Sequence, residues 1–275
     1  MIFSDLEKFE HYIPTAVGSD VSELQTYLHE AEQWMKGRIL GADLYAYMEN
    51  NPNAPERTSC ELAICLMAYH SAIPFVDLIQ TPNGFAVVRN ANQAPASKDR
   101  VDALIKQTER RLSDTLDSLL SAILYIHPVL HTEWRKSLAS VMLTNLFFFT
   151  ASELRQYTGN KDLTRNDFST YHSDLERIET DCSRYISDDY MKVIFERFRD
   201  NALTASDQYV WNALKTIAGL MLQKKEYYRV MENTVNFMIA NLSDFPEYEE
   251  SPEYRIKVGT KYENKKNHST FFFGW

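Results

Sequence analysis

Residues 97–126 read SKDRVDALIKQTERRLSDTLDSLLSAILYI, and this stretch decides the fold class. Its apolar side chains recur three or four residues apart, as they do on one face of an α-helix: Leu104, Leu112, Leu116, Leu119, Leu120 and Ile123. Ser97 precedes them as a favourable N-cap residue. The stretch therefore predicts one long amphipathic helix that reaches about Ile126 and needs other elements to cover its apolar face.

Similar spacing on both sides of this stretch predicts further helices. We expect them at about 21–36, 58–79, 132–149, 167–184, 188–199 and 206–241, with Gly37 and Gly41 at a break and Pro74 at a kink or end. The segment from 132 to 149 is apolar almost all round, so we expect it at the centre of the protein. The predicted fold is mainly α, a multi-helix bundle.

A few short strands and an extended C-terminal tail complete the predicted fold. After the turn at 81–84, residues 84–89 predict a strand in which Phe85 and Val87 are candidate strand-pairing positions. Residues 254–258 alternate with period two and predict a second strand, with Ile256 and Val258 as its pairing positions. We expect an N-terminal helical half (1–95), central and C-terminal helices on the same core (96–243) and the tail (244–275).

A weak internal repeat relates the two helical halves. Residues 39–45 resemble residues 185–191 at a displacement of 146, and each segment follows an amphipathic helix. The same displacement relates the helix expected at Thr58 to one at Thr204, and a strand follows each. Duplication and the chance recurrence of helix–break–helix patterns both explain these similarities.

Composition and charge limit the classes of partner. The 275 residues carry a net charge of −9 with lysines and arginines spread along the chain, which disfavours specific binding to nucleic acid. Three cysteines in a chain of this size indicate a reducing compartment. The start of the sequence lacks a signal peptide, and the most apolar stretch, 141–151, is too short to span a membrane. We therefore expect a cytoplasmic protein.

The sequence carries no recognisable catalytic, metal-binding or cofactor-binding motif. His127 and His131 lie four residues apart with Glu133 nearby, but Pro128 makes it unfavourable for both histidines to share one regular helix. Cys60 and Cys65 match neither redox nor zinc spacing and are interpreted as core residues. We therefore expect no enzymatic activity, no metal and no cofactor.

Two aromatic runs receive different interpretations. Residues Phe147–Phe149 lie within a predicted helix and are interpreted as core. The C-terminal run has no helix to bury it, so it either folds back as a strand or docks on another chain. Docking is favoured. The candidate partner-binding residues are therefore Phe271, Phe272, Phe273 and Trp275.

Several segments together resemble an uncharacterised family encoded in bacterial prophage-like regions of Bacteroides type. They are residues 81–88 (TPNGFAVV), 95–101 (PASKDRV), 157–161 (YTGNK), 164–168 (TRNDF), 175–179 (LERIE) and the polar stretch 263–271 that leads into the aromatic residues. The helical halves and tails of this family are similar to head-to-tail connector or adaptor proteins of tailed phages. The resemblance implies a non-enzymatic assembly protein whose partners are neighbouring copies in a ring and a portal protein, located in the virion.

Two other hypotheses are left open by the residues. One is a cytoplasmic α-helical adaptor that binds a host protein through the same aromatic tail. The other is a divergent metal-dependent enzyme built around His127, His131 and Glu133.

Overall fold

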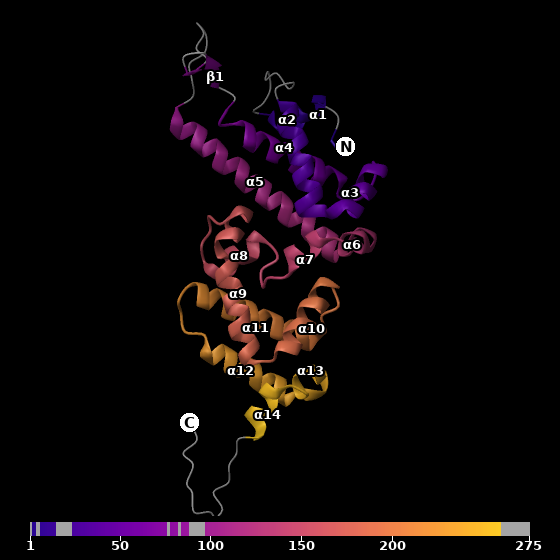
Figure 1. The fold of residues 1–275 in the computed structure, drawn as a ribbon, viewed down its shortest axis with the longest axis vertical. Helices are drawn as coiled ribbons and strands as arrows, with labels where there is room; N and C mark the ends of the chain where they lie inside the picture. The colour runs from indigo at the N-terminus through magenta and orange to yellow at the C-terminus, as the bar shows by residue number, and fades with distance from the viewer. Residues whose placement is uncertain are drawn as a thin grey trace, which may run out of the picture. The chain divides into compact units, whose positions relative to one another are not determined.

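A computed structural model of the chain describes residues 2–3, 6–14, 24–75, 78–81, 84–87 and 97–259. The described part is mainly α-helical, which confirms the predicted fold class (Figure 1). The chain forms two compact units. Unit 1 comprises Met1–Leu143, Phe149–Gln156 and Asn160–Thr170, and unit 2 comprises Thr144–Phe148, Tyr157–Gly159 and Tyr171–Trp275.

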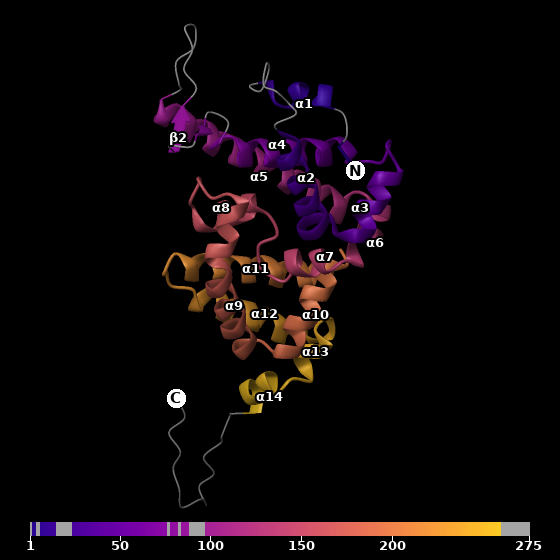
Figure 2. The same ribbon diagram turned by 45° about the horizontal axis from the view of Figure 1, so that its top comes forward.

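Unit 1 is organised around the long helix predicted from residues 97–126. That helix is α5 (Lys98–Tyr125), and α4 (Arg57–Ala72) packs along it while α2 (Gln25–Trp34) packs on α4 (Figures 1 and 2). The apolar stripe of α5 is buried at Leu112, Leu116, Leu119, Leu120 and Ile123. The other elements of this unit are α1 (Leu6–Tyr12), the π-helix η3 (Met35–Leu40), α3 (Gly41–Asn50), α6 (Pro128–Arg135), α7 (Leu138–Thr144), α8 (Ala151–Thr158) and the 3-10 turn η4 (Arg165–Asp167). Both α7 and α8 continue into unit 2 at their C-terminal ends.

Unit 2 surrounds Trp211, which is fully buried. The indole lies 4.8 Å from the ring of Phe198, 5.0 Å from that of Phe195 and 6.1 Å from that of Phe147, measured between centroids. Its helices are α9 (Phe168–Tyr185), which enters the unit at Tyr171, α10 (Asp188–Arg199), α11 (Ala205–Leu222), α12 (Tyr228–Ala240), η5 (Leu242–Asp244), α13 (Pro246–Glu249) and α14 (Pro252–Gly259). An aromatic cluster therefore holds this unit together.

The strand expected at 84–89 coincides with part of a short hairpin. β1 (Leu78–Thr81) and β2 (Gly84–Val87) are antiparallel, with Phe85 opposite Gln80 and Val87 opposite Leu78. Residues 88–89 lie outside the described part of the chain. The backbone partner of Phe85 and Val87 is therefore the strand immediately before them.

The helix predicted over 132–149 is wrong. The structure has two short helices, α6 and α7, followed by a non-helical segment in which Phe147, Phe148 and Phe149 are all buried. The backbone N–H groups of Phe149 and Thr150 donate to the Glu153 carboxylate at 2.7 and 3.2 Å, and the Thr150 hydroxyl accepts from the Glu153 N–H. This capping box begins α8 and keeps the preceding segment, which contains the three phenylalanines, from continuing into that helix. The three phenylalanines are therefore core residues, as predicted, but their backbone is not helical.

Two other helix boundaries also differ from expectation. The break expected between Gly37 and Gly41 is bridged by the π-helix η3, and the backbone turns at Gly41, whose φ is +76°. The single helix expected over 206–241 is broken between α11 and α12, where Lys224 adopts a left-handed φ of 55° and its N–H closes the end of α11 on the Met221 carbonyl. The break between α11 and α12 is not marked by proline, so helical periodicity did not reveal it.

The strand predicted at 254–258 is also wrong. These residues belong to α14, where Ile256 and Val258 are 65% and 52% exposed. Pro252 begins the helix, and the Ser251 hydroxyl accepts the Tyr254 N–H at 3.2 Å. Because this strand is absent, it cannot match the first strand in the proposed internal repeat.

The compact units divide the chain at places other than the expected boundary at 95/96. α5 packs on α4 and therefore belongs to unit 1 together with the N-terminal helices. The physical reason is that the stripe of α5 is buried by helices that precede it in the sequence.

Candidate functional site

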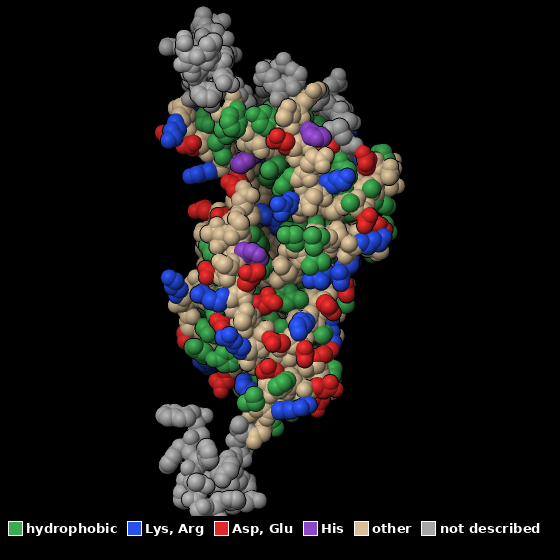
Figure 3. Space-filling view, viewed as in Figure 1, with side chains coloured by type: hydrophobic (Ala, Val, Ile, Leu, Met, Phe, Trp, Pro, Cys, Tyr) green, Lys and Arg blue, Asp and Glu red, His purple; other side chains and the backbone are tan. Residues whose placement is uncertain are grey.

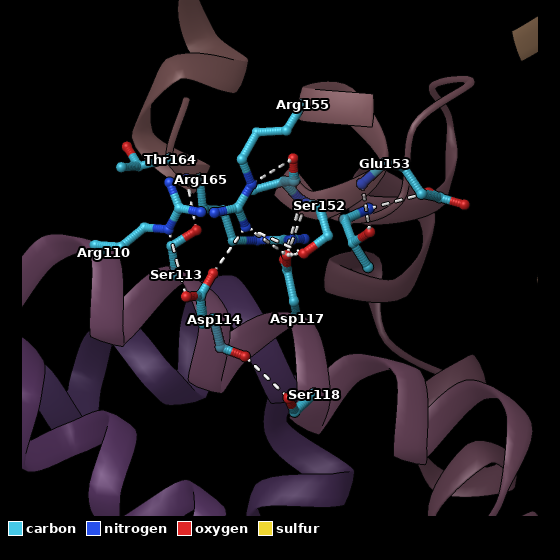
Figure 4. Close-up of polar contacts among 12 residues, drawn as sticks. Arg110, Ser113, Asp114, Asp117, Ser118, Ser152, Glu153, Arg155, Thr164 and Arg165 are labelled. Carbon is cyan, nitrogen blue, oxygen red and sulfur yellow. Dashed lines mark hydrogen bonds and ion pairs between the residues drawn. The ribbon is translucent and has the colours of Figure 1, made fainter. Parts of the chain in front are cut away.

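A cluster of buried polar side chains in unit 1 is the first candidate site (Figure 4). It joins one face of α5 to the start of α8 and to η4. At its centre is Asp117, whose side chain is 8% exposed although it carries a carboxylate. A buried carboxylate is stable only with hydrogen-bond donors or cations around it, so its partners define the site.

Asp117 caps the N-terminus of α8 from another helix. Its carboxylate accepts the backbone N–H groups of Ala151 at 3.0 Å and Ser152 at 2.8 Å, and the Ser152 hydroxyl at 2.8 Å (Figure 4). These donors would otherwise be left without partners in the first turn of the helix. The negative charge also lies at the positive end of the helix dipole.

Two guanidinium groups complete the surroundings of Asp117. Arg155 Nη2 lies 3.5 Å from one carboxylate oxygen and Arg165 Nη1 lies 3.3 Å from the other. Burial lowers the pKa of Arg165, and the charge of Asp117 opposes that shift. Arg155 also reaches Asp114 at 2.7 Å, where the carboxylate is half exposed. Its other terminal nitrogen, Nη1, is buried without a hydrogen-bond partner in the described part of the chain.

The segment that carries Arg165 is fixed to α5 by further hydrogen bonds. The Thr164 hydroxyl donates to Glu109 at 2.8 Å, and the Arg165 N–H donates to the Ser113 hydroxyl at 3.0 Å. Thr164 and Asp167 form a capping box at η4. The cluster therefore holds three separate segments of unit 1 in one arrangement.

A polar groove opens beside this cluster. It is lined by Arg110, Asp114, Asp117, Ser118, Ser121, Thr150, Ser152 and Arg155. Both oxygens of Asp117 are engaged by donors and cations, so the carboxylate is poorly suited to act as a base or a nucleophile. The arrangement can offer hydrogen bonds to a bound group, and its main physical effect is to fix α8 on α5.

A second hollow in unit 1 lies at the π-helix. Gly41 and Ser137 are in close approach there, since a Cβ atom on Gly41 would lie 2.2 Å from the Ser137 Cβ. The Trp134 indole N–H donates to the Ile39 carbonyl at 2.8 Å, which fixes the last turn of η3. The hollow is lined by residues Gln33, Lys36, Gly37, Gly41–Asp43 and Lys136–Ala139. Glycine and alanine residues thus leave part of its wall without long side chains.

Exposed apolar side chains gather near the same part of the sequence. Of eleven large hydrophobic residues that are exposed in the described part of the chain, five fall between residues 125 and 142: Tyr125, Ile126, Val129, Leu138 and Met142. Leu138 is 73% exposed and Met142 is 52% exposed, and their spacing places both on one face of α7. We call these five residues the 125–142 surface.

The comparison with known protein families gives one match. Residues 13–123 and 212–258, more than half of the chain, match the family described as "Family of unknown function (DUF6712)". The chain belongs to the DUF6712 family. No curated protein and no solved structure matches it. The expected membership of a family of unknown function is confirmed.

Only some residues of the two candidate sites lie within the segments that match DUF6712. Asp117 and the wall of the hollow from Gln33 to Asp43 lie in the first matched segment. Arg155, Arg165 and Leu138 lie between the two matched segments. The family match therefore covers the helices that carry Asp117 and the π-helix but not their partners.

The sequence of this DUF6712 protein predicted two sets of partner-binding residues, and the structure describes only one of them. Phe271, Phe272, Phe273 and Trp275 lie outside the described residues. Phe85 and Val87 pair within the β1–β2 hairpin. The other two predicted strand-pairing residues, Ile256 and Val258, lie on a helix, so a strand-pairing role for them is wrong.

His127, His131 and Glu133 do not converge on one point. His127 is the N-cap of α6 with extended backbone angles, and its Nε2 lies 3.5 Å from Glu56. Glu133 instead binds Lys136 at 2.8 Å. Within the described ranges, no group of three or more His, Cys, Asp or Glu side chains is arranged to hold a metal ion. The interpretation of His127 as a junction residue before Pro128 is confirmed by its position.

The three cysteines are buried and free. Burial raises the pKa of Cys60 and of Cys182 to about 12, and it also raises the pKa of Cys65. The interpretation of Cys60 and Cys65 as core residues is confirmed by their burial.

Sequence reasoning missed both candidate sites. The Thr150-x-x-Glu153 and Thr164-x-x-Asp167 spacings are visible in the sequence and mark the two segments that meet Asp117. Asp117 itself lies among the predicted core leucines of α5, and a charged residue in such a stripe signals a buried partner. The π-helix has no comparable signal.

No helix in the described part of the chain is both long and apolar enough to cross a membrane.

Proposed function

We propose that this chain is a non-enzymatic structural protein that assembles with other protein chains, as a prophage head-to-tail connector or adaptor. Its partners are neighbouring copies in a ring and a portal protein, and its place is the virion or the cytoplasm of the host. The observation that carries the assembly role is the 125–142 surface, where five large apolar side chains are exposed and two of them, Leu138 and Met142, share one face of α7. Large apolar side chains that are exposed in this way favour protein–protein contact.

The buried polar cluster supports the same proposal. A subunit that binds neighbouring copies in a ring needs a rigid fold. The Asp117 cluster supplies rigidity, because it fixes three segments of unit 1 by charged hydrogen bonds. Acidic and basic side chains are interspersed on the face shown in Figure 3. With a net charge of −9, such a surface would let DNA pass without binding it.

Surface variants test the assembly role. Replacing both Leu138 and Met142 by aspartate places charges on the 125–142 surface without touching buried residues. We expect the double variant to lose self-association in analytical ultracentrifugation while its circular dichroism stays unchanged. The matched control is Phe75→Asp, which charges another exposed apolar position of unit 1 (58% exposed). Equal association of the double variant and the wild type would argue against this surface.

The connector identity rests on the prophage resemblance and needs its own test. Genes for a portal protein, a capsid protein and a terminase are expected beside the gene for this chain, and co-expression with that portal protein should give a complex of defined mass. Copurification of one host protein at stoichiometric yield, with no binding to the portal protein, would instead favour a cytoplasmic adaptor.

A further inference from the structure

The hollow beside the π-helix has a wall suited to a flat apolar group. Gly37 is exposed, its φ is not in the left-handed region, and a Cβ built on it meets nothing within 4 Å. Gly41, Ala42 and Ala139 add further positions without long side chains. Backbone and short side chains leave room for a ring to lie flat against the wall.

The rim of the hollow offers two kinds of contact to an aromatic ring. Leu138 is 73% exposed and supplies apolar area. Lys36 and Lys136 both line the hollow, and an ammonium group over a ring face attracts the π electrons. Lys36 already makes one such contact, at 5.3 Å from the Tyr45 ring centroid. Lys136 is paired with Glu133, and Asp43 lies in the same wall, so the local charges largely balance.

The same chain carries a segment with matching chemistry. Residues 271–275 read FFFGW, so four of these five residues are aromatic. Residues 260–275 contain three lysines and one glutamate, a charge of +2, which leaves −11 on the preceding residues from the total of −9. Opposite charges attract the segment to another copy over distances longer than direct contact. Sixteen residues span at most about 58 Å when fully extended, so the segment is long enough to leave its own unit.

We propose that the hollow formed by η3, the start of α3 and the start of α7 binds the aromatic residues 271–275 of a second copy of this chain. The proposal rests on the proposed assembly function and names the surface through which neighbouring copies interlock. One ring lies against Gly37, and Leu138 covers its edge.

Cross-linking tests the position of the contact directly. Phe272 of the full chain is replaced by the photoreactive p-benzoylphenylalanine, isotopically heavy and light copies are mixed, and cross-linked peptides are identified by mass spectrometry. We expect heavy–light products that join residue 272 to 33–43 or 136–139. Products that form only within one copy, products at other positions, or no cross-linked product would each overturn the proposal.

A filling variant gives a second and independent measurement. Gly37→Trp occupies the hollow and, because the position is open, is compatible with folding. We expect its self-association to be weakened at least tenfold. The control Ala103→Trp adds the same side chain at an exposed position of α5 outside the hollow and should associate like the wild type.

The two proposals fail in different ways. If truncation after Asn264 abolishes association while Gly37→Trp does not weaken it, the hollow is the wrong receptor and the assembly role stands. If the full chain does not associate with itself or with a portal protein, the assembly role fails as well.

Discussion

Replacing Asp117 tests whether the buried polar cluster holds unit 1 together. The Asp117→Ala change removes a carboxylate that accepts three hydrogen bonds at 2.8 to 3.0 Å from Ala151 and Ser152. It also leaves two cations without their shared partner, since Arg155 and Arg165 have side chains that are 9% and 11% exposed. Breaking a buried ion pair from one side costs about 3–5 kcal/mol because the remaining charge stays buried.

Asp114 provides a matched control on the same helix. It binds the same arginine as Asp117, at 2.7 Å, but its carboxylate is 51% exposed. Water screens such a pair, so Asp114→Ala should lower the free energy of unfolding by less than about 1 kcal/mol. Comparing the two variants therefore shows whether the loss in free energy of unfolding comes from the burial of the ion pair or from the ion pair alone.

Urea denaturation followed by circular dichroism measures the difference. With a denaturant slope of about 2 kcal/mol per molar, Asp117→Ala should lower the midpoint of the transition that reports unit 1 by about 2 M. Hydrogen exchange of peptides from 98–125 and 151–158 assigns the transition to α5 and α8, where protection should fall. An Asp117→Ala midpoint equal to that of Asp114→Ala would refute the inference that the cluster stabilises the fold.

Three further outcomes follow from single residues. Gly41→Ala should destabilise the protein by more than about 1 kcal/mol in thermal unfolding, because φ is +76° and the new Cβ would meet Ser137, whereas Gly37→Ala should be neutral or stabilising; equal effects would contradict this. The thiol of Cys60, like the other two cysteines, should resist alkylation at pH 8 until urea is added, since burial raises its pKa to about 12, and rapid labelling of the folded chain would refute its burial. Burial, followed by the charge of Glu32, raises the pKa of Tyr45 to about 12 from 10.0, so its hydroxyl stays neutral in the folded state while the unfolded state ionises. The melting temperature should therefore fall between about pH 10 and pH 12, and fall less in Tyr45→Phe; an identical pH profile for the variant would contradict the assignment.

The long helix was predictable because its signal is local and repeated. The apolar residues of α5 recur from Leu104 to Ile123, and the structure buries those from Leu112 to Ile123 as the spacing predicts. The buried run Phe147–Phe149 shows the limit of that reasoning. Its burial could be read from composition, but its non-helical backbone depends on the Glu153 carboxylate, which begins the next helix.

Long-range partners explain most of what the sequence did not reveal. Asp117 meets Ser152 and Arg165, which lie 35 and 48 residues away, and no spacing rule links them. The hollow depends on Ser137 approaching Gly41 and on a π-helix, both of which follow from tertiary packing. The wrong strand at 254–258 arose because a period-two pattern over five residues is too short to outweigh the helix start at Pro252.

Solution mass by light scattering across concentration, for the full chain and for a chain truncated after Asn264, tests the assembly role most directly. We expect the full chain to form oligomers whose mass rises with concentration, and the truncated chain to be a monomer with unchanged circular dichroism. Two equally stable monomers at every concentration would contradict the claim that this DUF6712 protein assembles through its aromatic C-terminal residues.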